Sequence, residues 1–297
     1  MSFCSSVKGE LLNLRVSGCC LTAYSYGYML FARAFSIKRI ALQTASEQVA
    51  YGYCSAIEKR YKIRPEIKVG GSKKPTFIAE VESEADRLKI LAENDFGMNE
   101  ELIDDSIFIR DCCFGSFVRG AFLACGNIND PEKEYRLEFN VKSETIALEL
   151  QALLLQQGIS LKSTKLSKGL KLYTKDSGVI EDLLTFMGAS HHSLEIMDTK
   201  VYKSVKNNIN RARNCDSANI SKTVEASIKQ RRAIEFLKES DRLQSLPEEL
   251  LQAANLRLKN PEATLKELVR ISNEPLTVSG LNHRFKKIME IYEDIKK

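Results

Sequence analysis

No hydrophobic run in this 297-residue chain approaches the roughly 20 residues that a membrane-spanning helix needs. The opening residues MSFCSSVKGELL also lack the basic segment and apolar stretch that mark a secretory signal peptide. We therefore expect a cytoplasmic protein without a membrane partner. The length exceeds that of a usual single domain, and the composition, 43% hydrophobic and 28% charged, is that of an ordinary globular protein. Two domains are therefore expected.

Metal-binding sequence patterns are missing as well. None of the eight cysteines forms a C-x-x-C pair, and only three histidines are present to complete a site. The neighbours His191 and His192 have no carboxylate or thiol at ligand spacing. Because free cysteines pack as compact apolar groups in a reducing compartment, we expect that role for the thiols. We predict neither a metal site nor a cofactor.

Positive charge is concentrated in the second part of the chain. Residues 1–190 hold 24 basic and 24 acidic residues, whereas residues 191–297 hold 20 basic and 15 acidic residues. The segment from Lys200 to Arg232, which we call the basic strip, carries nine basic and two acidic side chains. Charge at this density attracts a polyanion such as nucleic acid.

The first 190 residues contain one series of predicted elements twice. Residues 7–35 have the pattern of a helix, and a strand at 37–44, a helix, a hairpin and another helix follow. The same order returns later in the sequence, with about 93 residues between the two leading helices. We interpret this as an internal duplication, with pseudo-repeats at about 19–96 and 109–189.

Beyond residue 190 the sequence becomes polar and helix-forming. We expect a basic helical linker at 191–245, in which asparagines weaken the first part and Ser221 starts a cleaner helix. Residues 246–297 are expected to form three compact helices with helix-turn-helix spacing, because prolines separate them. These helices are predicted at 247–260, 264–273 and 277–295.

Several segments resemble one bacterial family. They are VRGAFLACGNINDPEKEYRLEF (118–139), NNINRARNCDSANISKTVEAS (207–227) and NPEATLKELVRISNEPLTVSGLNHRFKKI (260–288), and the opening MSFCSSVKGELL fits as well. Together they resemble the WhiA family of regulators. The resemblance implies an α+β protein, with a pseudo-duplicated LAGLIDADG-like domain at residues 1–190 followed by an all-α helix-turn-helix domain.

The resemblance also implies a function. WhiA proteins bind promoter DNA and act in sporulation, or in cell division and chromosome segregation. We therefore expect a sequence-specific transcription regulator, associated with the nucleoid in the cytoplasm, whose partner is double-stranded promoter DNA. RNA polymerase or another regulator is a candidate further partner. The DNA motif, the regulated genes and the oligomeric state are left open by the sequence.

The LAGLIDADG motif permits a test for catalysis. Nucleases of this type place one acid at the end of each leading helix, and the paired carboxylates hold divalent ions for phosphodiester cleavage. Alignment of the motif with Val118–Gly126 puts Cys125 at the acid position, and alignment with Ser25–Arg33 puts Ala32 there. Neither side chain offers the oxygen that Mg²⁺ requires, so we expect no enzyme activity. Arg33 occupies a position where glycine usually lets the paired helices approach, and it should splay the pair or point outward.

The last predicted helix is the candidate reader of DNA. The second helix of a helix-turn-helix lies in the major groove, while the preceding helix and the turn contact phosphates. Thr277 is a suitable N-cap for this helix and is also included among the candidate DNA-binding residues. Its apolar residues Leu281, Phe285, Ile288 and Met289 are expected to pack on Leu265, Leu268, Val269 and Ile271. Candidate contacts to base edges are Ser279, Asn282, His283 and Lys286, and candidate contacts to the backbone are Lys266, Arg284 and Lys287.

The basic strip supplies a second set of candidates. With nine basic and only two acidic side chains, the basic strip has too few acids for ion pairs within a helix to account for its charge. The candidate phosphate contacts are Lys206, Arg211, Arg213 and Lys222. The alternative is a linker that only orients the two domains.

Two other functions stay open at this point. One is a metal-dependent nuclease that uses a relocated acid such as Asp130. The other is a protein-docking adaptor that binds transcription or division proteins, because a three-helix unit with a basic last helix is typical of such domains as well. Salt-dependent DNA binding distinguishes the regulator from the adaptor.

Overall fold

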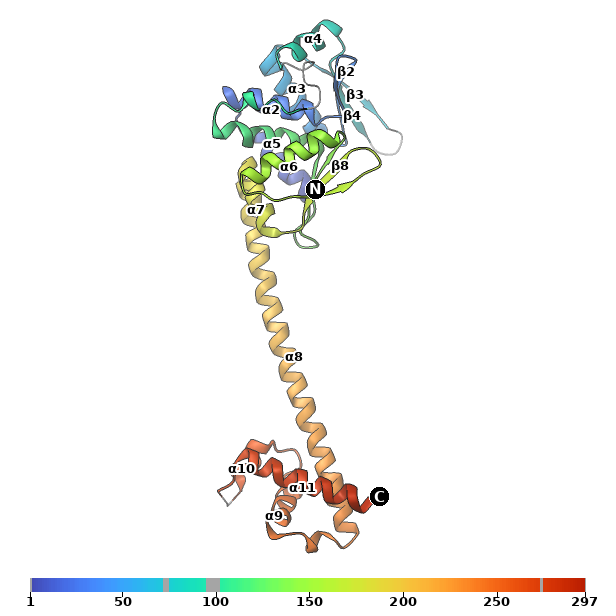
Figure 1. Ribbon diagram of the computed structural model, residues 1–297, viewed down its shortest axis with the longest axis vertical. Coiled ribbons are helices and arrows are strands. Elements are labelled where there is room, and N and C mark those ends of the chain that lie inside the picture. Colours follow the sequence, from blue (N-terminus) through green and yellow to red (C-terminus); the bar gives the residue numbers. More distant parts are fainter. Residues whose placement is uncertain (1, 72–74, 95–101, 273–274, 297) are drawn as a thin grey trace. The chain divides into compact units, whose positions relative to one another are not determined.

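The computed structural model describes residues 2–71, 75–94, 102–272 and 275–296. The chain divides into two compact units, Met1–Lys203 and Ser204–Lys297 (Figure 1). Across the described ranges, no helix combines the length and the apolar character needed to cross a membrane. The predicted element ends at residues 96 and 273 lie outside the described residues.

The first unit contains one arrangement twice. Its first copy comprises α2 (Cys19–Leu30), β1 (Ala34–Ser36), β2 (Arg39–Thr44), α3 (Glu47–Tyr61), β3 (Glu66–Gly70), β4 (Thr76–Glu80) and α4 (Glu84–Ala92). Its second copy comprises α5 (Asp111–Cys125), β5 (Gly126–Ile128), β6 (Leu137–Val141), α6 (Glu144–Gln156), β7 (Lys162–Lys165), β8 (Leu170–Thr174) and α7 (Ser177–Met187). The two antiparallel sheets have corresponding strand orders, β1-β2-β4-β3 and β5-β6-β8-β7. The predicted α+β class and internal duplication are confirmed.

The leading segment differs from its prediction. In place of one helix over residues 7–35, the structure has α1 (Phe3–Asn13) and α2, followed by the short strand β1. The interruption covers residues 14–18 and ends at Gly18, the N-cap of α2, whose φ of +57° lies in the left-handed region that favours glycine. The predicted strand at 37–44 is β2, which begins at Arg39. A three-residue strand is too short to show an alternating pattern, so β1 and β5 escaped prediction.

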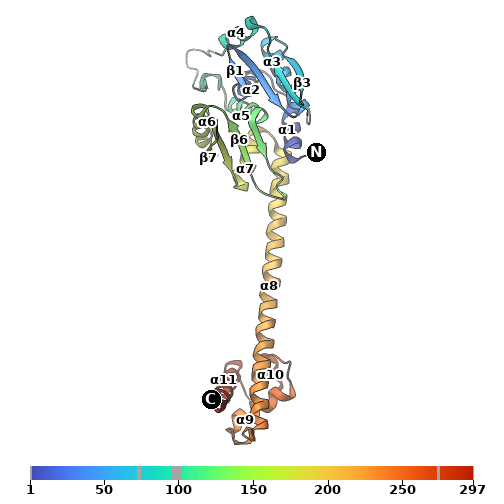
Figure 2. The same cartoon turned by 90° about the vertical axis from the view of Figure 1, so that its right-hand side faces the viewer.

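The helices α2 and α5 lie side by side in the centre of this unit, and the two sheets belong to the flanking halves (Figures 1 and 2). One hydrophobic core includes buried residues from both repeats. Tyr26 of α2 stacks on Phe117 of α5 with 5.8 Å between ring centroids. The duplicated halves are therefore one folding unit held by a shared helix pair.

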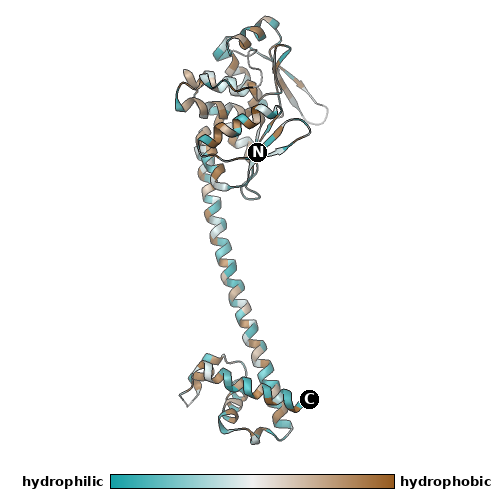
Figure 3. Cartoon of the chain, in the orientation of Figure 1, coloured by the Kyte–Doolittle hydropathy of each residue, from teal (hydrophilic) through white to brown (hydrophobic). Residues whose placement is uncertain are grey.

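One long helix, α8 (Ser190–Glu239), begins in the first unit and continues into the second. The prediction that it is interrupted near Ser221 was wrong. The segment contains neither glycine nor proline, and each asparagine lowers helix propensity by less than about 1 kcal/mol. Figure 3 shows mainly hydrophilic residues along the middle of this helix.

The first unit also contains the short 3₁₀ helix η1 (Asp105–Ile107). The second unit contains the corresponding short helix η2 (Leu243–Ser245) and three shorter α-helices. These are α9 (Glu248–Lys259), α10 (Leu265–Ile271) and α11 (Val278–Lys296), close to the predicted positions. Its core contains Ile234 and Leu237 from the end of α8, together with Leu250, Leu268 and Phe285. The end of α8 is thus a fourth helical segment of this unit, although its sequence resembles a polar linker.

Candidate nucleic-acid interface

Two threonines fix where the helices of the candidate reader begin. Thr264 and Glu267 form a capping box at the start of α10, with Glu267 Oε2 2.7 Å from the Thr264 backbone nitrogen. Thr277 Oγ1 accepts a hydrogen bond from the Gly280 backbone nitrogen at 3.1 Å at the start of α11. The predicted cap at Thr277 is therefore present, and its hydroxyl already serves the helix.

The helix α11 buries one face and leaves the opposite face exposed. Leu281, Phe285 and Ile288 are buried in the core of the second unit. At about 100° per residue, Ser279, His283 and Lys286 fall within about 60° of one another on the other side. All three side chains are exposed. We call Ser279, Asn282, His283 and Lys286 the reading face.

The remaining candidates border this face. Asn282 is half-buried, and Lys287 on α11 and Lys266 on α10 are exposed. Further along the exposed side of α11, Glu290 and Glu293 replace the basic residues. The basic candidates are thus confined to the N-terminal half of the helix, and Lys296 in the last turn is separated from them by these acids.

Arg284 has a partner inside the unit. Its Nε lies 3.7 Å from Glu249 Oε2 of α9, and its side chain is only 17% exposed. By helix geometry it falls near the buried side of α11, away from His283. Its predicted contact with the DNA backbone stays a prediction, although the structure gives the side chain a role in packing α9 on α11.

Two apolar residues differ from expectation. Met289 is half-buried, and Ile271 at the end of α10 is 52% exposed, so Ile271 is outside the core that it was expected to join. Ile271 is the last residue of α10, and it lines an open pocket with Leu281 and Arg284 of α11 in place of joining the core.

Sequence reasoning missed Arg257, which organises the interior of the unit. Although charged, it is 2% exposed. Its Nε donates to Gln230 Oε1 of α8 at 3.0 Å, a second guanidinium nitrogen donates to the Ala263 carbonyl oxygen, and the group lies 5.2 Å from the Phe285 ring centroid. Burial lowers the pKa of Arg257. Arg257, on α9, thus contacts α8, the turn that precedes α10, and α11. It packs against the buried side of the helix that carries the reading face.

The basic strip lies on α8 and does not form a single face. Lys206, Arg211, Arg213 and Lys222 are all exposed, and the described residues include no salt-bridge partner for them. Residues 206 and 213 are seven apart and share one side of the helix, while 211 and 222 are eleven apart and share another. The two sides are about 160° apart by helix geometry. A straight duplex can contact only one pair at a time.

Other cations of the strip have partners. Lys203 Nζ donates to the Pro131 carbonyl oxygen at 2.7 Å and lies 4.7 Å from the Tyr135 ring centroid. Lys200 lies 3.5 Å from Glu181, and Arg231 lies 3.3 Å from Glu235 on the same helix. Some cations of the basic strip therefore make contacts within the protein. A count of charges in the sequence does not reveal such contacts.

The acid positions of the LAGLIDADG-like fold lie at the C-terminal ends of α2 and α5. Ala32 is buried, and burial raises the pKa of the Cys125 thiol to about 12, so this sulfur stays protonated. Lys8 of α1 donates from Nζ to the Leu123 carbonyl oxygen at 3.2 Å and interacts electrostatically with Cys125. The Lys8 amino group therefore lies near one of the two acid positions of the motif.

Two further residues near the acid positions, Arg33 and Asp130, also provide no metal site. Arg33 is exposed and points outward, one of the two expected outcomes, and its carbonyl oxygen accepts a hydrogen bond from Lys142. The alternative acid, Asp130, caps a turn by accepting a hydrogen bond from the Glu132 backbone nitrogen at 2.9 Å. Among the described residues, no group of three or more carboxylate, histidine or cysteine ligands gathers at this end of the helix pair.

The thiols were expected to be buried packing groups. This is correct for Cys54 and Cys113, which are buried, but wrong for Cys112 and Cys215, which are exposed. Four of the eight also converge, as described below. The spacing of the sequence did contain a signal, because the Cys19-Cys20 and Cys112-Cys113 pairs are separated by the interval of the internal duplication.

The comparisons with known proteins match both units. The family model of the WhiA LAGLIDADG-like domain matches residues 114–206, and that of the WhiA C-terminal HTH domain matches residues 209–292. Proteins named "Probable cell division protein WhiA" are similar over the whole chain. The one from Bacillus velezensis is 33% identical over 310 residues, with 100% of this chain and 98% of that protein covered. The one from Carboxydothermus hydrogenoformans is 34% identical over 308 residues with the same coverage.

A solved structure extends the likeness to three dimensions. The crystal structure of full-length WhiA from Thermatoga maritima matches with a TM-score of 0.60 and 28% identity, over 99% of each chain. The LAGLIDADG-like fold, the helix-turn-helix and the similarity across the whole length agree with one another. This chain belongs to the WhiA family.

Proposed function

We propose that this protein is a sequence-specific transcription regulator that reads promoter DNA with α11. The exposed reading face opposite the buried side of that helix is the observation that carries the proposal. Asparagine can bond to adenine with both amide atoms, lysine can reach guanine O6 and N7, and serine and histidine offer further polar contacts. Because these side chains occupy the first turns of α11, they suit a helix that enters the groove by its N-terminal end.

The charge pattern supports this orientation. Lys287 is exposed on α11 next to the reading face and Lys266 is exposed on the preceding helix α10, where the helix-turn-helix arrangement would let both contact phosphates. Glu290 and Glu293 would repel phosphates and keep the far end of α11 out of the groove. Lys206, Arg211, Arg213 and Lys222 of the basic strip supply additional phosphate contacts in this proposal.

We further propose that the LAGLIDADG-like unit has no catalytic activity. Cleavage by this fold requires oxygen donors for divalent ions, and the corresponding positions are Ala32 and a protonated Cys125. The Lys8 ammonium group beside Cys125 adds positive charge that opposes metal binding there.

The relatives' names suggest the cellular context. They refer to cell division, and on that basis we propose a role in cell division. From the resemblance to the WhiA family we also propose a role in chromosome segregation or in sporulation, in the cytoplasm and in association with the nucleoid. RNA polymerase or another regulator is proposed as a further partner.

DNA binding by the full chain, measured on fragments enriched from a genomic or random pool, tests the proposal. We expect affinity to fall steeply with salt. Replacement of Asn282 and Lys286 by alanine should each weaken binding by about 1–3 kcal/mol. Lys296→Ala at the other end of α11 is the matched control and should bind like the wild type.

Three results would redirect the assignment. Unchanged affinity in both reading-face variants would remove α11 as the reader. The absence of any mobility shift at moderate salt would favour the protein-docking adaptor. Cutting of supercoiled plasmid with Mg²⁺ or Mn²⁺, abolished by Asp130→Asn, would establish the metal-dependent nuclease that uses a relocated acid.

A further inference from the structure

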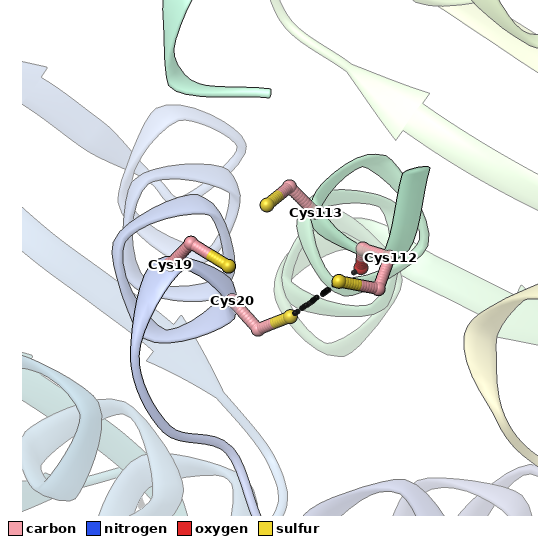
Figure 4. Close-up of side chains that lie close together, drawn as sticks. All are labelled: Cys19, Cys20, Cys112 and Cys113. Atoms are coloured by element: carbon pink, nitrogen blue, oxygen red, sulfur yellow. Dashed lines mark hydrogen bonds between the residues drawn. The ribbon is translucent and has the colours of Figure 1, made fainter. Parts of the chain in front are cut away.

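Four cysteines converge at the N-terminal ends of the central helix pair. Cys19 and Cys20 begin α2, and Cys112 and Cys113 lie in the first turn of α5. Figure 4 shows the four side chains directed into the space between the two helices. Their Sγ atoms all lie within 4.8 Å of one another, and those of Cys20 and Cys112 are 3.3 Å apart. This is the opposite end of the helices from the degenerate acid positions.

The cluster follows the symmetry of the duplicated fold. Cys19 corresponds to Cys112 and Cys20 to Cys113, at the interval that separates Gly27 from Gly120 along the paired helices. Each repeat therefore contributes the same pair of residues from the same helical turn. A group assembled from both halves in this way is positioned by the fold itself and does not depend on flexible loops.

We propose that the four cysteines bind a single zinc ion that joins the two repeats. Zinc–sulfur bonds are about 2.3 Å long, so the sulfurs of a tetrahedral zinc site lie about 3.8 Å apart. The Sγ–Sγ distances in the cluster, from 3.3 Å for Cys20 and Cys112 up to a limit of 4.8 Å, lie on either side of 3.8 Å. Four thiolate ligands select zinc or iron over the hard ions that oxygen donors prefer. In a polynuclear iron–sulfur cluster the four thiolates are shared among two or more irons, so some of their sulfurs lie farther apart than the 4.8 Å limit seen here.

The surroundings suit a negatively charged centre. A zinc ion with four thiolates carries a net charge of −2, and both helix N-termini present their positive dipole ends to it. Arg110 interacts electrostatically with Cys19, and Arg119 with Cys20. A cavity of about 410 Å³ lined by Arg15, Cys20, Cys112 and Arg119, among others, provides a path from solvent. Cys113 is buried and the other three cysteines are at least partly accessible, so the ion would be held at the edge of the core.

The site would have a structural role. Four protein ligands leave no open coordination position for substrate, as is typical of structural zinc. Bridging α2 to α5 would stabilise the helix pair at the end where Cys20 meets Cys112. The proposed zinc site does not depend on the proposed DNA binding, and an experiment can contradict either proposal without affecting the other.

Metal titration of the full chain tests the proposal. Reduced, metal-free protein should bind one Zn²⁺ per chain in competition with a chromophoric chelator. Co²⁺ in its place should give the intense visible bands and sulfur-to-cobalt charge transfer of a tetrahedral thiolate site. Loss of a residue that only supports a metal ligand lowers metal affinity by up to about 100-fold. Because Cys20→Ser and Cys112→Ser each remove a ligand itself, each should lower zinc affinity by more than this. Cys215→Ser, which removes an exposed thiol elsewhere, should bind zinc like the wild type.

A measurement on the unmodified chain guards against variants that do not fold. Zinc should protect four thiols from alkylation, a chelator should release them, and mass spectrometry should identify them as Cys19, Cys20, Cys112 and Cys113. Zinc should also raise the melting temperature of the wild type and of Cys215→Ser. The proposal would be overturned by equal zinc affinity in Cys20→Ser, by protection of other cysteines, or by a Cys20–Cys112 disulfide forming in preparations that fail to bind the metal.

Discussion

Gly27 and Gly120 face each other's helices at equivalent points of the α2–α5 pair. A Cβ atom added to Gly27 would lie 2.3 Å from the Phe117 carbonyl oxygen, and one added to Gly120 would lie 2.3 Å from the Tyr24 carbonyl oxygen. Both glycines occupy the third position of the motif as aligned with residues 25–33 and 118–126. The absence of both side chains is what lets the two backbones approach.

Gly27→Ala and Gly120→Ala should therefore destabilise the first unit. A methyl group cannot be accommodated against backbone atoms without separating the helices, and overpacking of this kind costs about 1–3 kcal/mol or more. Chemical denaturation of the full chain measures the change. Gly9→Ala on α1 is the control, because nothing lies within 4 Å of its added Cβ, and it should be neutral or stabilising by up to about 1 kcal/mol.

The helix pair also shows what the sequence could predict. The order of elements and the interval between leading helices indicated the duplication, because both are properties of local pattern. Arg33 was interpreted as occupying the place of a close-approach glycine, whereas Gly27 performs that role and Arg33 is exposed. Which motif position touches the partner helix depends on the packing of two segments far apart in the chain, and one segment alone does not contain that information.

The Glu10 carboxylate links α1 to the start of α8. It accepts hydrogen bonds from the backbone nitrogens of His191 at 2.9 Å and His192 at 3.3 Å, and it contacts the His192 ring. Burial acts to raise the pKa of Glu10, but the hydrogen bonds from His192 and His191 outweigh it, and the pKa is lowered. Sequence spacing could not associate these residues, because Glu10 is 182 positions from His192.

Acid should remove the stabilisation that this carboxylate provides. Since its folded-state pKa is lowered, the contribution is complete above the unfolded value of about 4.3 and is lost as pH falls through the folded value. Glu10→Gln should reduce the free energy of unfolding by about 1–3 kcal/mol at neutral pH, with a smaller difference from wild type in acid. Denaturant titrations from neutral pH into acid measure this, with the exposed Glu132→Gln as control. A difference that does not change with pH would contradict the assignment.

Arg257→Ala should loosen the second unit. The change removes the hydrogen bond to Gln230 and the contact with the Phe285 ring, which should cost about 2–3 kcal/mol. Hydrogen exchange should then accelerate in α9, α10 and α11 while the first unit keeps its protection. Lys259→Ala, at an exposed position of the same helix, should change stability by less than about 0.5 kcal/mol. Equal exchange in the two variants would show that Arg257 does not organise the core.

The two sides of the basic strip should behave differently. If a duplex runs along one side of α8, the double variant on that side, Lys206→Ala with Arg213→Ala or Arg211→Ala with Lys222→Ala, should lower the salt slope of binding by about two. The other double variant should leave the slope unchanged. Affinity measured across a salt series distinguishes them. Unchanged slopes in both would identify the strip as a linker without phosphate contacts.

The candidate site was only partly accessible to sequence reasoning. Helical spacing identified the buried residues Leu281, Phe285 and Ile288 and hence the opposite face, because amphipathic pattern is local. The partner of Arg284 and the burial of Arg257 depend on tertiary contacts with α9 and α8, and an arginine in a polar helix gives no sign of either. The convergence of the four cysteines escaped because each half-site is only two adjacent thiols, and the interval of the duplication is the one feature of the sequence that relates the two pairs.

Sequence preference, determined by selection from a random DNA pool, tests the central claim most directly. The full-length wild type, Asn282→Ala and Lys266→Ala would be compared in parallel. Loss of the Asn282 side chain from the reading face should relax the preference at one or two base pairs, whereas loss of Lys266 should weaken binding to all sequences and keep the motif. The same motif with unchanged stringency in Asn282→Ala would contradict base reading by α11 at this residue.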